Sequence, residues 1–182
     1  MTEDNGNDAL GTVRGDGTLI IERIVPGALE RVWEYITDAD KRATWLAGGE
    51  FDLRAGGEAR LSFRLDELTG EPVPERYGTV QHHEHICRIT RCEPPHVLAF
   101  TWPEGGGAES EVTFELEPRE DSVLLRLTHR RLPDRETEID VASGWHAHLG
   151  LLADRLSARP PRGFWSAHAA AEARYEQIVP AR

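Results

Sequence analysis

Histidine and cysteine give this 182-residue chain its most conspicuous chemical candidates, and three of them alternate in one segment. His83, His85 and Cys87 share one face of what reads as an extended strand, where ring nitrogens and a thiolate could coordinate zinc. A structural zinc site usually takes paired ligands from two elements, and the sequence has neither H-E-x-x-H nor C-x-x-C, so we predict no metal site. If this face points into a cavity, His83 and His85 become hydrogen-bonding or acid/base groups instead.

His129 is the second candidate because it ends an alternating segment that begins at Val123. The alternation puts its imidazole on the inward face, together with Val123, Leu125 and Leu127. A buried imidazole needs a hydrogen-bond partner. We interpret His129 as a structural residue that ties a strand to a helix, with an acid/base role as the alternative.

The usual motifs of catalysis are missing from the sequence. It has no G-x-S-x-G nucleophile elbow, and Lys41 is its only lysine, which excludes a P-loop and leaves one side chain for a Schiff base. The glycines from Gly105 to Gly107 fit a hairpin turn rather than a phosphate cradle. We therefore predict no catalytic residue and no cofactor, and we favour a role other than catalysis.

Charge and composition exclude several classes of partner. Acidic residues outnumber basic ones by 32 to 21, a net charge of -11, which argues against a nucleic-acid partner. No run of about 18 apolar residues occurs, so we predict no membrane insertion. The first residues do not form a basic and then apolar leader, and Cys87 and Cys92 lie too far apart on one strand for a disulfide. We therefore expect a cytoplasmic protein with free thiols.

The order of predicted elements is that of a mixed fold with one core. Segments with alternating or β-branched apolar residues predict strands over 18–25, 51–65 (a hairpin that turns at Gly56 and Gly57), 77–91, 97–102, 110–117 and 123–129. Helical spacing predicts helices after Pro26, from Asp38, over 134–157 and over 164–178. We divide the chain into a flexible acidic tail (1–17), one domain (18–158) and a helical extension (159–182).

Five blocks of the sequence resemble a known family, the bacterial branch of the family named after the activator of the heat-shock-protein-90 ATPase. These blocks are ERIVPGALERVWEYITDADKRATWL, EFDLRAGGEARLSF, RCEPPHVLAFTW, LLRLTHRRLP and GWHAHLGLLADRL. The resemblance spans about residues 18–158. The chain departs from the family pattern in the longer connection from Asp66 to His85 and in the helical segment after Pro160, and both departures affect the rim of any cavity.

The resemblance implies the helix-grip fold of the START and birch-pollen-allergen-like superfamily. This α+β fold has a curved antiparallel sheet of about six to seven strands wrapped around a long C-terminal helix, with two short helices after the first strand. The superfamily also implies an apolar cavity between sheet and helix, near whose rim we expect His146 or His148. The side chains we assign to ligand binding there are Trp45, Phe63, Trp102, Phe114, His129, Trp145 and Leu149.

Three functions stay open at this point. The leading hypothesis is a domain that binds an apolar or amphipathic small molecule without a defined reaction. The second is an enzyme of the polyketide cyclase type, with His129 or His83 as the general acid or base. The third is an interaction protein, either related to chaperones, as the family's namesake suggests, or a homodimer through Phe164, Trp165 and Tyr175. Fold resemblance carries most of this reasoning, and fold alone does not determine function.

Overall fold

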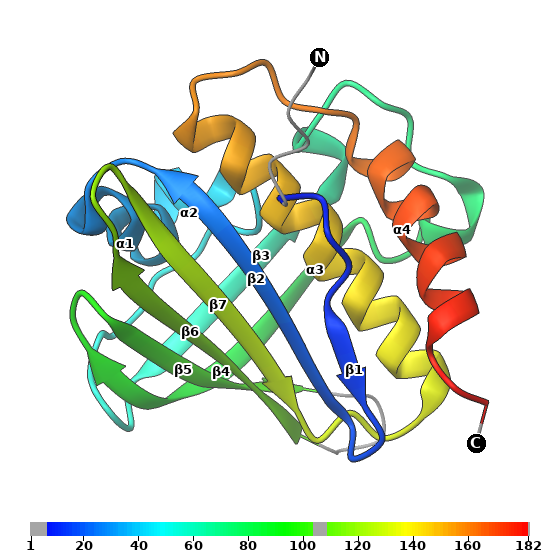
Figure 1. Cartoon of the computed structure of the whole chain (residues 1–182), viewed down its shortest axis with the longest axis horizontal. Coiled ribbons are helices and arrows are strands. Elements are labelled where there is room, and N and C mark those ends of the chain that lie inside the picture. The colour runs from blue at the N-terminus through cyan, green and yellow to red at the C-terminus, as the bar shows by residue number, and fades with distance from the viewer. Residues whose placement is uncertain (1–6, 104–108, 182) are drawn as a thin grey trace.

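A computed structural model describes residues 7–103 and 109–181, and it shows the predicted α+β fold (Figure 1). The strands are β1 (Thr12–Arg14), β2 (Thr18–Pro26), β3 (Glu58–Arg64), β4 (His82–Glu93), β5 (Val97–Pro103), β6 (Glu109–Pro118) and β7 (Ser122–Arg130). The helices are α1 (Leu29–Thr37), α2 (Ala39–Ala43), α3 (Arg135–Leu156) and α4 (Phe164–Ile178), with 3-10 turns η1 (Leu65–Glu67) and η2 (Glu75–Tyr77). The turn expected at Gly105 to Gly107 lies outside the described residues.

The seven strands form one antiparallel sheet in the order β1-β2-β7-β6-β5-β4-β3. Strands β3 to β7 are a meander, and β2 closes onto β7 with Leu19 opposite His129 and Val25 opposite Val123. The sheet curves around α3, which lies across its concave face (Figure 1). Side chains on that face alternate with exposed ones, as the sequence pattern predicts. The helix-grip architecture is therefore confirmed.

The helices begin where capping chemistry places them. The Asp38 side chain accepts a hydrogen bond from the backbone nitrogen of Lys41 (2.9 Å) at the start of α2. The Asp134 side chain does the same for the nitrogen of Thr137 (2.8 Å) at the start of α3. The predicted helices over 134–157 and 164–178 are thus confirmed as α3 and α4.

The hairpin predicted over 51–65 forms only in part. Phe51 makes a single isolated bridge with Ala59, and only the second half of the segment is a strand, β3. The buried guanidinium of Arg42 explains this, because it lies 3.7 Å from the Phe51 ring centroid and donates hydrogen bonds to the carbonyls of Ala47, Gly48 and Gly49. Those contacts hold the chain before Phe51 in an irregular path.

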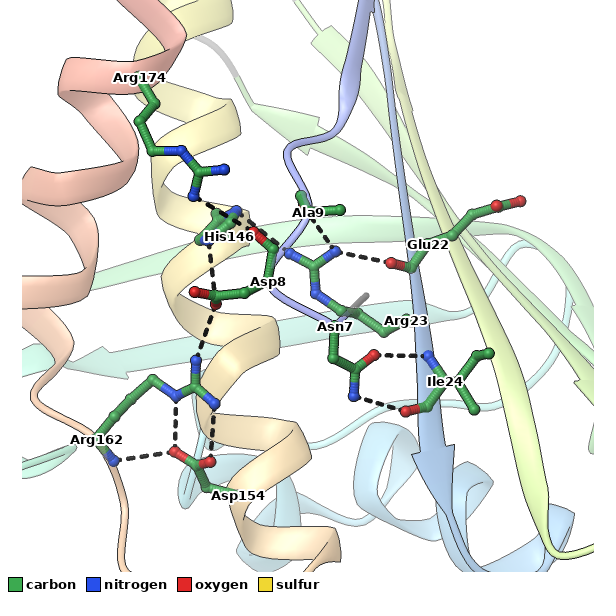
Figure 2. Close-up of polar contacts among 10 residues, drawn as sticks. All are labelled: Asn7, Asp8, Ala9, Glu22, Arg23, Ile24, His146, Asp154, Arg162 and Arg174. Carbon is green, nitrogen blue, oxygen red and sulfur yellow. Dashed lines mark hydrogen bonds and ion pairs between the residues drawn. The ribbon is translucent and has the colours of Figure 1, made fainter. Parts of the chain in front are cut away.

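Residues 7–17, part of the segment expected to be a flexible tail, make defined contacts with the rest of the chain. β1 pairs with β2, and the side chain of Asn7 bonds both the backbone nitrogen and the carbonyl of Ile24 (2.8 and 2.7 Å). Figure 2 shows the carboxylate of Asp8 between Arg162 (3.2 Å) and the ring of His146 (3.6 Å). These side-chain contacts supply the partners that composition alone did not reveal. Residues 1–6 lie outside the described part of the chain.

Helix α4 belongs to the same hydrophobic core as the sheet and α3, rather than forming a separate extension. Phe164, Trp165 and Tyr175 are buried in that core at 2%, 6% and 0% exposure. The hydroxyl of Tyr175 accepts a 2.8 Å hydrogen bond from the backbone nitrogen of Gly11. α4 therefore connects the far end of the chain to its first strand. No helix in the described part of the chain is long and apolar enough to cross a membrane.

Candidate functional site

A cavity of about 1250 Å³ opens between one end of the sheet, the first half of α3, α4 and the segment from Leu65 to Val80. Its volume exceeds that of a typical small-molecule pocket, roughly 300 to 1,000 Å³. The apolar and aromatic side chains on its walls include Leu46, Phe63, Leu65, Tyr77, Trp102, Ile139, Trp145, Phe164 and Trp165. The histidines on its walls are His83, His85, His148 and His168.

Of the seven residues assigned to ligand binding from the sequence, three lie on the cavity wall. Phe63 and Trp102 come from β3 and β5, with ring centroids 6.0 Å apart, and Trp145 lies 5.3 Å from Trp102 on α3. The other four are core residues away from the wall, at most 1% exposed: Trp45, Phe114, His129 and Leu149. The prediction identified the inward faces, but it could not separate side chains that fill the core from those that border the cavity.

The contacts of His129 match its interpretation as a structural residue. The indole nitrogen of Trp145 donates to its Nδ1 (3.0 Å), and its Nε2 lies 2.6 Å from the hydroxyl of Ser110. Since Nδ1 accepts, the neutral ring must carry its proton on Nε2 and donate to Ser110. Burial lowers the pKa of His129 to about 3, with a smaller contribution from Arg131. This tautomer has no free lone pair with which to act as a general base.

His83 and His85 face the cavity. A hydrogen-bonding or acid/base role, the alternative to zinc binding, requires this orientation. The His83 ring stacks on Phe63 at 4.4 Å, and the His85 ring meets Trp102 edge-on at 4.9 Å. Burial lowers both pKa values, that of His85 to about 4, so both rings are neutral at pH 7. Burial also raises the pKa of Cys87 to about 12, which disfavours its thiolate.

Among the described residues, one group of side chains could together hold a metal ion, and it does not include His83, His85 or Cys87. It consists of Asp66, Glu67 and His82, whose ligand atoms lie within 4.8 Å of one another on the surface. All three are exposed, and exposed acidic groups commonly gather without a metal ion. The zinc ligands considered from the sequence, His83, His85 and Cys87, do not form such a group.

Two of the cavity walls come from the two segments that depart from the family pattern, which the sequence linked to the rim of a cavity without identifying the residues involved. The segment before β4 and helix α4 pack on each other: Tyr77 stacks on Trp165 at 4.9 Å, and Arg76 forms an ion pair with Glu172. Glu71 accepts hydrogen bonds from the nitrogen and hydroxyl of Ser166 at the start of α4. The aromatic residues of 164–178 are visible in the sequence, where a dimer surface is one of the alternatives left open.

The structure contradicts the hypothesis of a dimer surface on α4. Phe164, Trp165 and Tyr175 are buried within a single chain, so they offer no face to a second copy. Their partners are residues of α3, the segment before β4 and the N-terminal strand. An apolar helix face that is covered within its own chain does not require an oligomer.

The two histidines expected near the rim have different environments. His148 lies on the cavity wall, and its Nδ1 donates to the carbonyl of Trp45 (2.7 Å), so its Nε2 is unprotonated in the neutral ring. Burial lowers the pKa of His148 to about 4. His146 lies away from the cavity, where a nitrogen of Arg23 donates to its Nδ1 (3.2 Å; Figure 2).

Comparison with known proteins supports the resemblance seen in the sequence. Residues 27–157 match the family model described as "Activator of Hsp90 ATPase homolog 1-like protein". A Bordetella parapertussis protein of known solution structure is 44% identical, with a TM-score of 0.82 over 100% of this chain and 97% of that one. No curated protein matches the sequence.

More distant solved structures share the fold. CalU16 of Micromonospora echinospora is 23% identical, with a TM-score of 0.68 over 95% of this chain and 97% of that one. DynU16, a protein of the dynemicin biosynthetic locus, is 21% identical, with a TM-score of 0.63 over 82% of this chain and 51% of that one. The family match covers most of the domain and agrees with the sheet and helices described above. The chain therefore belongs to the family of Activator of Hsp90 ATPase homolog 1-like proteins.

Proposed function

We propose that this protein binds an apolar or amphipathic small molecule in the cavity between α3, α4 and the sheet. The observation that carries the proposal is Gly144, in the middle of α3 and on the cavity wall. A Cβ added at Gly144 would meet no atom within 4 Å. Glycine inside a helix costs about 1 kcal/mol relative to alanine. The structure shows no way in which this glycine stabilises the fold, but its missing side chain leaves space for a ligand in the cavity.

The aromatic wall suits such a ligand. Trp102, Trp145 and Trp165 line the cavity, and four histidines with lowered pKa values add neutral polar groups. Small-molecule sites typically combine apolar and aromatic side chains with placed polar groups. The free thiols Cys87 and Cys92 agree with the reducing compartment that we propose, the cytoplasm.

A cyclase-type enzyme is the second candidate, favoured by the histidines on the cavity wall. Of these, His148 has an unprotonated Nε2 in its neutral form and could accept a proton, whereas His129 is buried in a hydrogen-bonded position outside the cavity. A pKa of about 4 makes His148 a weak base at pH 7. We therefore propose ligand binding as the main function and catalysis as the second candidate.

Two substitutions at Gly144 test the binding proposal. Gly144→Phe puts a ring into the cavity, and Gly144→Ala, the matched control, adds only a methyl group. We expect the neutral dye Nile red to bind the parent protein and Gly144→Ala, and to bind Gly144→Phe at least about tenfold more weakly while that variant keeps its melting temperature. Native mass spectrometry would detect a co-purified small molecule in the first two proteins. Equal dye binding by Gly144→Phe, or no binding by any of the three, would contradict the proposal.

A further inference from the structure

Two pairs of acidic residues border the cavity from two different helices. Glu136 and Asp140 are four residues apart on α3, and Glu172 and Glu176 are four residues apart on α4. Residues at this spacing lie side by side on a helix, where like charges destabilise it. Both pairs line the same cavity, so four acidic residues border it from two helices.

Few positive charges compensate them. Arg76 forms an ion pair with Glu172, and Arg135 donates to the backbone carbonyls of Val179 (3.1 Å) and Glu176 (2.8 Å). The carboxylates of Glu136, Asp140 and Glu176 have no hydrogen-bond or salt-bridge partner among residues 7–103 and 109–181. The four cavity histidines add no charge at pH 7, because burial lowers their pKa values.

Asp140 is exposed, yet partial burial at the cavity wall raises the pKa of its carboxyl group. The nearby carboxylates of Glu172 and Glu136 raise this pKa further, whereas His168 and Arg76 lower it. A positive group beside Asp140 would lower the free energy of its ionised form.

The aromatic wall next to these carboxylates already holds one cation. The guanidinium of Arg76 lies 4.6 Å from the ring centroid of Tyr77, whose other neighbour is the stacked ring of Trp165. Cations interact favourably with aromatic faces at this distance. The cavity wall therefore combines aromatic faces with carboxylates, a surface suited to cations.

We infer that the ligand of this cavity is a cationic amphiphile, an aromatic or aliphatic body that carries an amine or quaternary ammonium group. The body would lie against Trp102 and Trp145, and the cation would lie at the opening, near Glu136 and Asp140. This inference rests on the proposed function, since it names the class of ligand for the same cavity.

Three probes with one naphthalene body test the charge preference: 2-naphthylmethyl-trimethylammonium, 2-naphthylmethanol and 2-naphthoate. Binding is measured by quenching of tryptophan fluorescence at low salt, in the full chain. We expect the cation to bind about tenfold more tightly than the alcohol, and the carboxylate to bind more weakly than both. At about 0.15 M salt the preference should shrink, because the Debye length falls to about 8 Å.

The matched variants are Glu136→Gln with Asp140→Asn, and Glu30→Gln with Glu34→Gln as the control. The control pair is also four residues apart, on α1 away from the cavity, and it changes the net charge by the same amount. We expect the first double variant to lose most of the preference for the cation and the control to keep it. Equal binding of cation and alcohol by the parent protein, or equal loss in both double variants, would overturn the inference.

These outcomes separate the inference from the proposed function. If the alcohol binds and Gly144→Phe abolishes that binding, the cavity is a binding site whatever the charge preference. If the alcohol then binds as tightly as the cation, only the ligand class is wrong. If none of the three probes binds, the proposed function and this inference both fail.

Discussion

The indole nitrogen of Trp145 donates a 3.0 Å hydrogen bond to Nδ1 of His129, and this contact joins α3 to β7 beneath the cavity wall. The hydroxyl of Ser110 continues the chain of contacts, 2.6 Å from Nε2 of His129 and 3.3 Å from the carbonyl of Trp102. The helix that borders the cavity is thus fixed to three neighbouring strands by neutral polar groups. Because both ring nitrogens are engaged, the contacts stabilise position rather than activate a nucleophile.

Removing the donor from this contact should destabilise the fold. Trp145→Phe leaves Nδ1 of a buried histidine without a hydrogen bond, which costs about 1–3 kcal/mol in addition to the lost packing. Urea unfolding measures this, with Trp33→Phe on α1 as the control, because the Trp33 side chain makes no hydrogen bond to any of the described residues and is 9% exposed. An equal loss of unfolding free energy in both variants would show that the hydrogen bond contributes nothing.

Acid should destabilise the protein well above the pH at which carboxylates titrate. His129, His146 and His148 are buried with pKa values lowered to about 3, 4 and 4. Below their unfolded pKa of about 6.5 the unfolded chain binds protons that the folded chain does not, so stability is complete above that pH and is lost as the pH falls toward 4.

Each of these histidines contributes a slope of up to about 1.4 kcal/mol per pH unit in that range. Denaturant unfolding at several pH values gives the slope directly. His148→Gln keeps a donor for the carbonyl of Trp45 but cannot take up a proton, so the slope should decrease by up to one histidine's share. An unfolding free energy that does not change between pH 7 and pH 5 would contradict the prediction.

The N-terminal segment should contribute measurably to stability. Tyr175→Phe removes the acceptor for the buried backbone nitrogen of Gly11, so we expect a loss of about 1–3 kcal/mol. Tyr35→Phe on α1 is the control, since the Tyr35 hydroxyl has no hydrogen-bond partner in residues 7–103 and 109–181 and the residue is only partly buried. Hydrogen exchange of the Gly11 amide should become faster in the first variant only. Unchanged exchange there would mean that the hydroxyl does not hold this strand.

Two glycines of α3 should respond differently to the same substitution. Gly144→Ala meets open space, so we expect the helix propensity of alanine to stabilise the protein by about 1 kcal/mol. Gly150→Ala would place its Cβ 3.1 Å from Cδ of Arg162, which is held by Asp154 and Asp8 (Figure 2). It should therefore gain less or lose stability. Thermal unfolding compares the two, and equal melting temperatures would show that Arg162 can move aside at no cost.

Local patterns predicted most of the fold. Strands with alternating burial and helices with capping aspartates, such as Asp38 and Asp134, carry their signal within a few residues. The errors fall where an individual side-chain contact decides the outcome. Arg42 binds carbonyls five to seven residues further along the chain, before Phe51. Asp8 lies against Arg162, 154 residues further along the chain. The alternation and helical spacing of apolar residues do not reveal such contacts.

The sequence predicted a cavity but not all of its walls, because some walls depend on contacts between segments that are far apart in the sequence. The sequence identified the inward faces of β3, β5 and α3, and hence Phe63, Trp102 and Trp145. The remaining walls depend on the contact of Tyr77 with Trp165, which joins two segments outside the family pattern. Without that contact, an aromatic helix such as α4 fits a dimer surface as well as it fits a cavity wall.

During synthesis, β2 is completed well before β7, the strand with which it pairs. The register joins Pro26 to Ser122 and Leu19 to His129, so the partner of β2 leaves the ribosome about a hundred residues after it. At roughly 5–20 residues per second this takes roughly 5–20 seconds. During that interval the apolar segment TLIIERIVP has no sheet to join. The nascent chain therefore exposes Leu19, Ile21 and Val25 to water until β7 has been made, whereas the folded protein buries all three completely.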